Sequence, residues 1–232
     1  MRLIYQGPWY PGEIGFKPGL GRDCLDPVNC WSDKTVMKKL IPLMTVTLGL
    51  LLLAAGPALT AARLQTAVFA GGCFWSMQHD MEHIPGVVST EVGYSGGHLA
   101  NPTYQDVTTE TTGHYESIKV TYDPAKITYP QLVERYFHTT DPTDDGGAFC
   151  DRGPSYRPVI FVGDATQRTV AEQAKARARA QLKQNIATQI LPRVPFYPAE
   201  DYHQHYSDKN PVPYGIYRQG CGKDRRIKEL WG

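Results

Sequence analysis

The sequence has few cysteines and almost no net charge. Its 232 residues include five cysteines, and 24 basic side chains nearly balance 23 acidic ones to leave a net charge of +1. This cysteine content excludes a small disulfide-stapled scaffold. Without an excess of basic residues, nothing indicates a nucleic-acid-binding surface, and we expect no nucleic-acid partner. Internal repeats and low-complexity tracts are also missing, which excludes a repeat array.

What is present is the composition of an ordinary globular protein with a real core. Hydrophobic residues make up 41% of the chain and aromatic residues 11%. A chain of this length suits one domain with appendages, and we expect a monomer. The odd number of cysteines leaves at least one thiol outside any complete pairing, so a reactive cysteine is worth seeking.

Charged residues are absent from residues 40–62, directly after Lys38 and Lys39. A basic start, a short apolar stretch and small residues near its end are typical of a secretory signal peptide. We therefore predict that residues 37–62 are a signal peptide and that the protein is exported to the periplasm. A membrane anchor is the alternative, because an anchor needs only about 20 apolar residues.

Residues 1–36 do not fit a signal peptide, which should begin the chain. We interpret them as an upstream segment without structure, with translation beginning at Met37. Residues 63–232 then form the mature domain, which keeps Cys73, Cys150 and Cys221. Disulfides persist in an exported protein, so a thiol that acts there as a thiol needs an external source of electrons.

The hydrophobic pattern of the domain predicts a mixed α/β fold of the α+β kind. We expect strands at residues 66–70, 87–94, 116–122, 157–162 and 187–191, and helices at 73–84, 129–138 and 164–184. The order β-α-β-β-α-β is that of the ferredoxin-like split β-α-β two-layer sandwich. Residues 95–112 and 139–155 are expected to be long loops, and the tail after residue 192 is expected to be irregular.

Cys73 lies where a strand ends in Gly71-Gly72 and a helix begins. Unpaired N–H groups and the positive end of the helix dipole stabilise a thiolate there, so we expect the pKa of Cys73 to fall from about 8.5 toward neutral. Phe74 and Trp75 are either core aromatics or an apolar wall beside the thiol. Such a wall suits a methyl-sized apolar group.

Several polar residues are candidates for the same site. Glu116 lies at the start of a strand, opposite Ser117, and would face a pocket if the other face of that strand packs on the core. A carboxyl group in such a pocket has a raised pKa and can donate a proton near pH 7. Tyrosine hydroxyls in turn-rich loops, those of Tyr104 and Tyr156, can donate hydrogen bonds, and Asp151 can accept one.

The domain closely resembles the A-type peptide-methionine (S)-S-oxide reductases, the methionine sulfoxide reductase A family, over about residues 66–232. The resemblance rests on the order and spacing of eight motifs: GGCFW at 71–75, GYSGG at 93–97, NPTY at 101–104, TGHYE at 112–116, VTYDP at 120–124, DPT at 141–143, DRGPSYR at 151–157 and AEDYHQHY at 199–206.

The resemblance implies the chemistry of the reacting atoms. Cys73 would attack the sulfur of a methionine sulfoxide and become a sulfenic acid. Glu116 would protonate the departing oxygen, and Tyr104 and Tyr156 would hydrogen-bond it. The implied activity is repair of oxidised proteins under oxidative stress.

It also implies how substrate is held and how the thiol is restored. Phe74 and Trp75 would hold the substrate's S-methyl group, and Asp151 would help to hold the substrate. A resolving thiol would convert the sulfenic acid into a disulfide, and an external thioredoxin-like dithiol would reduce it, with no metal or other cofactor. The tail position of Cys221 favours it as the resolving thiol, with Cys150 as the alternative.

Two other functions stay open on the residues alone. A cysteine hydrolase would pair Cys73 with His79 or His114 as its base. A metal-binding or redox-sensing module would use the thiols or the His203 and His205 pair as ligands.

Overall fold

The computed structural model describes residues 63–232. The predicted upstream segment at residues 1–36 and the signal peptide or anchor at residues 37–62 lie outside this part of the chain. Within the described residues, no helix combines the length and the apolar character needed to cross a membrane.

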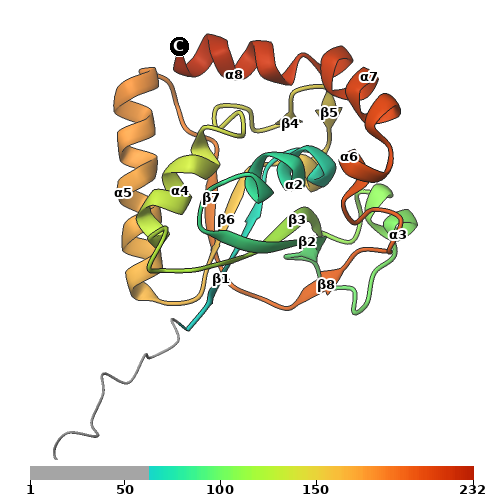
Figure 1. Ribbon diagram of the computed structural model, residues 1–232, viewed down its shortest axis with the longest axis horizontal. Helices are drawn as coiled ribbons and strands as arrows, with labels where there is room; N and C mark the ends of the chain where they lie inside the picture. Colours follow the sequence, from blue (N-terminus) through green and yellow to red (C-terminus); the bar gives the residue numbers. More distant parts are fainter. Residues whose placement is uncertain (1–62) are drawn as a thin grey trace, which may run out of the picture. The chain divides into compact units, whose positions relative to one another are not determined.

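A six-stranded sheet in the order β7-β6-β1-β3-β2-β8 forms the centre of the domain (Figure 1). Its strands are β1 (Gln65–Ala70), β2 (Val87–Ser95), β3 (Tyr115–Tyr122), β6 (Val159–Val162), β7 (Gln189–Pro192) and β8 (Phe196–Pro198). Neighbours are antiparallel except β6 and β7. The inner order β6-β1-β3-β2 is that of the split β-α-β arrangement, so the predicted fold class is confirmed.

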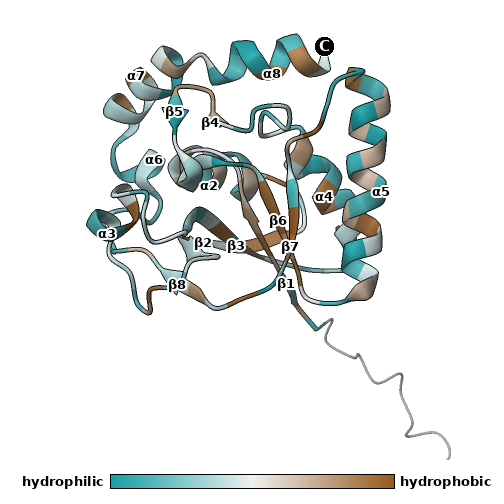
Figure 2. Cartoon of the chain, turned by 180° about the vertical axis from the view of Figure 1, so that it is seen from behind, coloured by the Kyte–Doolittle hydropathy of each residue, from teal (hydrophilic) through white to brown (hydrophobic). Residues whose placement is uncertain are grey.

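Three helices pack on one face of this sheet: α2 (Phe74–Glu82), α4 (Tyr129–Phe137) and α5 (Ala165–Leu182). Alternation along β1 explains the layering, because Ala67 and Phe69 join the core under the helices while Val68 and Ala70 face the other side. Figure 2 shows the most hydrophobic residues concentrated on the central strands.

Strand β3 follows the same alternation and corrects one expectation. Ile118, Val120 and Tyr122 point into the core beneath the helices. Because side chains repeat every two residues along a strand, Glu116 lies on this core face, toward α2, and not on a face turned away from the core. Glu116 is 2% exposed.

The segments expected to be loops contain short elements. Helix α3 (Tyr104–Thr108) begins inside the predicted loop at 95–112, where Thr103 and Asp106 cap it reciprocally. The loop at 139–155 contains a small sheet of β4 (Gly147–Ala148) and β5 (Asp151–Arg152), followed by the 3₁₀ turn η2 (Pro154–Tyr156).

The prediction of an irregular tail is wrong. After β8 the chain forms α6 (Tyr206–Lys209), α7 (Pro211–Cys221) and α8 (Lys223–Trp231), which follow one another at the edge of the domain (Figure 1). Pro211 and Pro213 open α7, where proline is tolerated. Gly222, at φ +66°, makes the turn into α8. Proline and glycine thus start and end these helices, although in the sequence they suggest an absence of helix.

Candidate active site

Cys73 is the N-cap of α2, directly after β1. Its carbonyl oxygen accepts hydrogen bonds from the amides of Ser76 and Met77, so the side chain lies at the first turn of the helix. Gly72 has φ +96°, and a Cβ there would come within 3.1 Å of Ala148. Glycine therefore permits the tight turn that places the thiol. The thiol is unpaired and buried.

Glu116 reaches the same helix start from β3. Its Oε2 accepts a hydrogen bond of 3.0 Å from the amide N–H of Phe74. Burial raises the pKa of Glu116 to about 8, although the Phe74 N–H acts in the opposite direction. The carboxyl group is consequently protonated at neutral pH, as a proton donor must be.

The expected fall in the pKa of Cys73 is wrong. Burial raises its pKa, and the carboxyl groups of Glu116 and Asp151 raise it further. The hydroxyl of Tyr217 and the amide of Trp75 act in the opposite direction but are outweighed. Desolvation of the charged form is stronger here than the helix dipole, so Cys73 rests as a neutral thiol.

The two predicted tyrosines and Asp151 are gathered around this centre. Tyr104 is the first residue of α3; burial raises its pKa to about 12, and the nearby Glu116 and Cys73 raise it too. Tyr156 ends η2, and its carbonyl accepts from the amide of Gly72 at 2.9 Å. Burial also raises the pKa of Tyr156. Both phenols remain protonated and able to donate.

Tyr217 is a site residue that the sequence analysis missed. It lies on α7, where its hydroxyl donates to Oδ2 of Asp151 at 2.6 Å and also contacts the thiol of Cys73. Burial raises its pKa, and the charges of Cys73 and Asp151 raise it further. No local pattern indicates it, because the sequence of the tail predicts irregular structure and Tyr217 is 144 residues from Cys73.

Phe74 and Trp75 both belong to the apolar cluster beside the thiol, and they differ in exposure. Phe74 is 1% exposed and packs against Tyr94 and His203. Trp75 is half-buried; it stacks on Tyr206 with ring centroids 3.7 Å apart, and its indole N–H donates to Nδ1 of His203 at 3.0 Å. Phe74 thus forms the base of the apolar cluster, and Trp75 is its more accessible member.

The segment before α6 holds this aromatic wall in place. The hydrogen bonds of its two histidines show what each side chain contacts. Glu200 accepts from the hydroxyl of Tyr94 at 3.0 Å and from the amide of Tyr104 at 2.9 Å. His203 is occupied by Trp75, and Nδ1 of His205 lies 3.0 Å from Glu82. His203 and His205 therefore have different partners and do not form the metal-ligand pair considered from the sequence.

Cys150 and Cys221 form a disulfide that joins the loop before β5 to the end of α7. Their Cα atoms are 4.8 Å apart, across 71 residues of sequence. Cys150 is exposed and Cys221 half-buried, while Asp151 and Tyr217 connect this pair to the Cys73 thiol. The structure thus holds the first thiol free and the two candidate resolving cysteines paired with each other.

The arrangement suits attack by sulfur combined with proton donation. The arrangement fits a cysteine hydrolase less well. Both ring nitrogens of His114 are engaged, one by the amide of Gly97 at 3.2 Å and the other by the carbonyl of Leu99 at 2.8 Å. His79 lies further along α2, against His83 and Tyr214. Neither histidine is positioned as a base for Cys73.

The peptide methionine sulfoxide reductase family model matches residues 65–232. The chain belongs to this family. Like its other members, this reductase is an oxidoreductase that acts on sulfur. The resemblance carried by the eight motifs is therefore confirmed.

Similar proteins support the assignment over most of the domain. The chain is 56% identical over 197 residues to peptide methionine sulfoxide reductase MsrA 2 of Caulobacter vibrioides, covering 84% of this chain and all of that one. It is 48% identical to the Limosilactobacillus reuteri MsrA, covering 72% and 97%.

Solved structures agree. Methionine sulfoxide reductase A of Corynebacterium diphtheriae matches with a TM-score of 0.59 at 32% identity, covering 68% of this chain and 78% of that one. Reduced Mxr1 of Saccharomyces cerevisiae matches with a TM-score of 0.62 at 31% identity, covering 66% and 88%.

Proposed function

We propose that this reductase acts on the S epimer of methionine sulfoxide in oxidised proteins and peptides through Cys73 and Glu116. The observation that carries the proposal is a free thiol at the start of α2 beside a carboxyl group that is protonated at neutral pH. A sulfoxide oxygen leaves poorly unless it is protonated, and Glu116 supplies that proton. Free methionine sulfoxide is a second substrate of the same chemistry.

The electrons and protons of the first step balance. The sulfur of Cys73 bonds to the sulfoxide sulfur, and the S–O bond breaks as the protonated oxygen leaves. That oxygen, or a water that takes its place, then attacks the sulfur of Cys73 and breaks the new S–S bond, which releases methionine and leaves Cys73 as a sulfenic acid. Cysteine loses two electrons and the methionine sulfur gains them. Glu116 gives its proton to the oxygen and regains one from the thiol, so no proton is consumed. Tyr104 and Tyr156 donate hydrogen bonds to the same oxygen.

Substrate selection follows from the apolar wall. The S-methyl group packs against Trp75, which is locked by Tyr206 and His203, and Phe74 closes the base of the pocket. Asp151 lies beside the Cys73 thiol, held by Tyr217, and its remaining lone pairs can accept hydrogen bonds from the polar part of the substrate. A wall held in this way supports selection by shape.

Recycling uses the remaining two thiols. Cys221 attacks the sulfenic sulfur of Cys73 and releases water, with Cys150 as the alternative attacker. The third cysteine then displaces Cys73, which leaves the Cys150–Cys221 disulfide and a free Cys73. An external dithiol of the thioredoxin kind reduces this disulfide, which its exposed Cys150 side makes accessible.

The test is reduction of a peptide that contains methionine S-sulfoxide, with and without a dithiol. The expected result is multiple turnover with reductant and, without it, conversion of only a stoichiometric amount of substrate. Multiple turnover by Cys73→Ser would overturn the assignment. Cleavage of esters or amides without reductant would favour the hydrolase.

Export to the periplasm stays part of the proposal. It is supported by Lys38 and Lys39 before an uncharged stretch that ends where the described domain begins. Fractionation of cells followed by mass spectrometry of the N-terminus tests it. A processed N-terminus near residue 62 in the periplasmic fraction supports a cleaved signal, and an intact N-terminus in the membrane fraction supports an anchor.

A further inference from the structure

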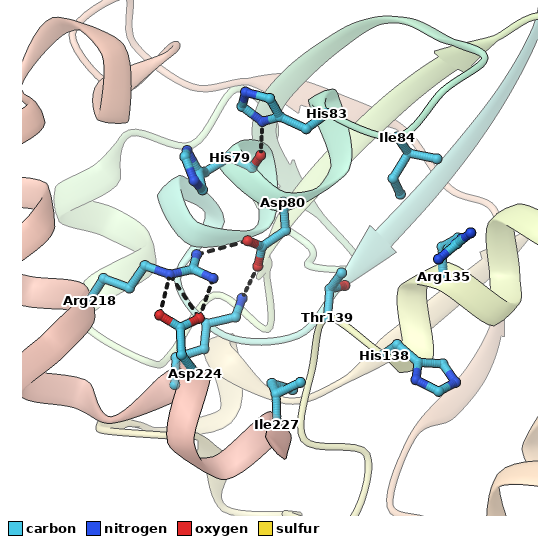
Figure 3. Close-up of a pocket in the computed structure, with 11 residues that line it drawn as sticks. His79, Asp80, His83, Ile84, Arg135, His138, Thr139, Arg218, Asp224 and Ile227 are labelled. Carbon is cyan, nitrogen blue, oxygen red and sulfur yellow. Dashed lines mark hydrogen bonds and ion pairs between the residues drawn. The ribbon is translucent and has the colours of Figure 1, made fainter. Parts of the chain in front are cut away.

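Helix α2 ends in a cluster of three side chains that bind metals well, at the opposite end from Cys73. One ligand atom each from His79, Glu82 and His83 lies within 4.8 Å of the others. The two histidines are four residues apart, so they share one face of the helix. Figure 3 shows both rings projecting from that helix at the rim of a pocket of about 360 Å³.

Hydrogen bonding leaves Nε2 of His83 available to bind a metal ion. Its Nδ1 lies 2.6 Å from the carbonyl oxygen of His79. A carbonyl oxygen only accepts, so Nδ1 carries the proton and Nε2 keeps a free lone pair. A backbone carbonyl bonded to the inner ring nitrogen is the support commonly found behind a metal-binding histidine.

The other two ligands each have a buried atom without a partner. Among residues 63–232, Nδ1 of His79 and Oε1 of Glu82 are both buried and unbonded. The second oxygen of Glu82 pairs with Nδ1 of His205 at 3.0 Å. Buried polar atoms without partners are destabilising, and a cation between them would satisfy both.

Two of the three cationic side chains that line the pocket, Arg218 and Lys223, are already paired with carboxylates, and the third is Arg135. Asp80 forms ion pairs with Nη1 of Arg218 and with Nζ of Lys223, each at 2.8 Å, and Arg218 also pairs with Asp224 at 2.6 Å (Figure 3). These ion pairs neutralise Arg218 and Lys223 and so reduce, with Arg135 left unpaired among residues 63–232, the repulsion that a divalent cation would meet at the histidines.

We propose that His79, Glu82 and His83 bind a divalent late first-row metal ion, with Zn²⁺ as the representative. Two imidazoles and one carboxylate suit Zn²⁺, Ni²⁺ and Cu²⁺ and leave an open position for water. Ligands about 2.1 Å from a tetrahedral ion lie about 3.4 Å apart, so side-chain adjustments of about 1 Å complete the site.

The same ion would connect α2 to the segment that holds the aromatic wall. Glu82 also belongs to a second group of ligand atoms, with His205 and Asp208, again within 4.8 Å of one another. His205 directly precedes Tyr206, which stacks on Trp75. Occupancy at Glu82 would therefore restrain the segment next to the proposed methyl pocket.

The test is titration of the full chain with Zn²⁺ and with Ni²⁺ by calorimetry, with the Cys150–Cys221 disulfide intact and free thiols alkylated. We expect one ion per chain. The affinity should fall by about tenfold or more in each of His79→Ala and His83→Ala, because the loss of a residue that only supports a ligand already lowers metal affinity by that factor. His138→Ala, which removes a histidine that lines the same pocket outside the cluster, should bind like the natural chain.

Co²⁺ substitution gives an independent readout. Its visible spectrum should show ligation by nitrogen and oxygen without the strong thiolate absorption, and the signal should disappear in the double variant His79→Ala/His83→Ala. Absence of stoichiometric binding, equal loss in His138→Ala, or unchanged affinity in the double variant would overturn the proposal. Retained sulfoxide reduction in each variant verifies folding.

Discussion

The hydroxyl of Tyr217 donates a 2.6 Å hydrogen bond to Asp151, and it does so beside the Cys73 thiol. Asp151 directly follows Cys150, and Tyr217 lies one helical turn before Cys221. One hydrogen bond therefore joins the two segments that carry the Cys150–Cys221 disulfide and places both beside Cys73. The three cysteines form one unit, although 148 residues separate the first from the last.

Replacing the cysteines one at a time should separate chemistry from recycling. Cys73→Ser is expected to lose sulfoxide reduction altogether, because serine is a far weaker nucleophile for sulfur. Cys221→Ser should still convert one substrate per chain and then stop. The measurement is methionine formed per chain, by chromatography, with and without dithiol.

Cys150→Ser provides the comparison for the resolving step. If Cys221 attacks the sulfenic acid, Cys150→Ser accumulates a Cys73–Cys221 disulfide, visible by peptide mass spectrometry. A Cys73–Cys150 disulfide that accumulates in Cys221→Ser, with none formed in Cys150→Ser, would contradict that order.

Glu116→Gln should slow the first step by about 10²–10⁴-fold, the usual contribution of a general acid. Glutamine still accepts from the Phe74 amide but supplies no acidic proton. The pKa of Glu116 is raised to about 8, so the acid is present below that pH and is lost as the pH rises through it. Single-turnover rates should therefore fall above about pH 8, and this decline should be absent in Glu116→Gln.

Tyr217→Phe should retain the aromatic ring and lose the hydrogen bonds to Asp151 and Cys73. Without the hydroxyl, the pKa of Cys73 rises further and less thiolate forms. A hydrogen bond to a charged group is worth about 1.5–3 kcal/mol, so the first step should slow by about tenfold or more. Alkylation of Cys73 across a range of pH measures the shift directly, and Tyr202→Phe, an exposed tyrosine, serves as the control.

Asp80→Asn should destabilise the fold strongly. Asp80 pairs with Arg218 and with Lys223, whose side chain is only 3% exposed. Removing one partner of a buried ion pair costs about 3–5 kcal/mol, because the other charge stays buried. The midpoint of urea unfolding is the measurement. Glu91→Gln, which breaks the exposed pair with Lys119, should change stability by less than about 1 kcal/mol.

The local pattern was sufficient for the elements whose signal is periodic. Strand β3 and helix α4 were predicted within a few residues because each alternates apolar and polar side chains at its own period. Strand β1 was predicted from a short apolar run before two glycines, and helix α5 from the Asp164 cap and its helix-forming residues. Helices α7 and α8 were missed because Pro211, Gly220 and Gly222 suggest irregular structure. Their stability comes from contacts such as that of Lys223 with Asp80, which lies 143 residues earlier in the chain.

The sequence by itself determined the family and predicted the nucleophile and the acid, since GGCFW and TGHYE are local motifs with a fixed spacing. Only the tertiary structure decided how these groups ionise and which cysteines pair. Burial outweighs the helix dipole at Cys73 and keeps both thiol and Glu116 protonated. Tyr217 and the Cys150–Cys221 disulfide reach the site only because α7 folds back over it, and the contacts that hold α7 there join residues far apart in the sequence.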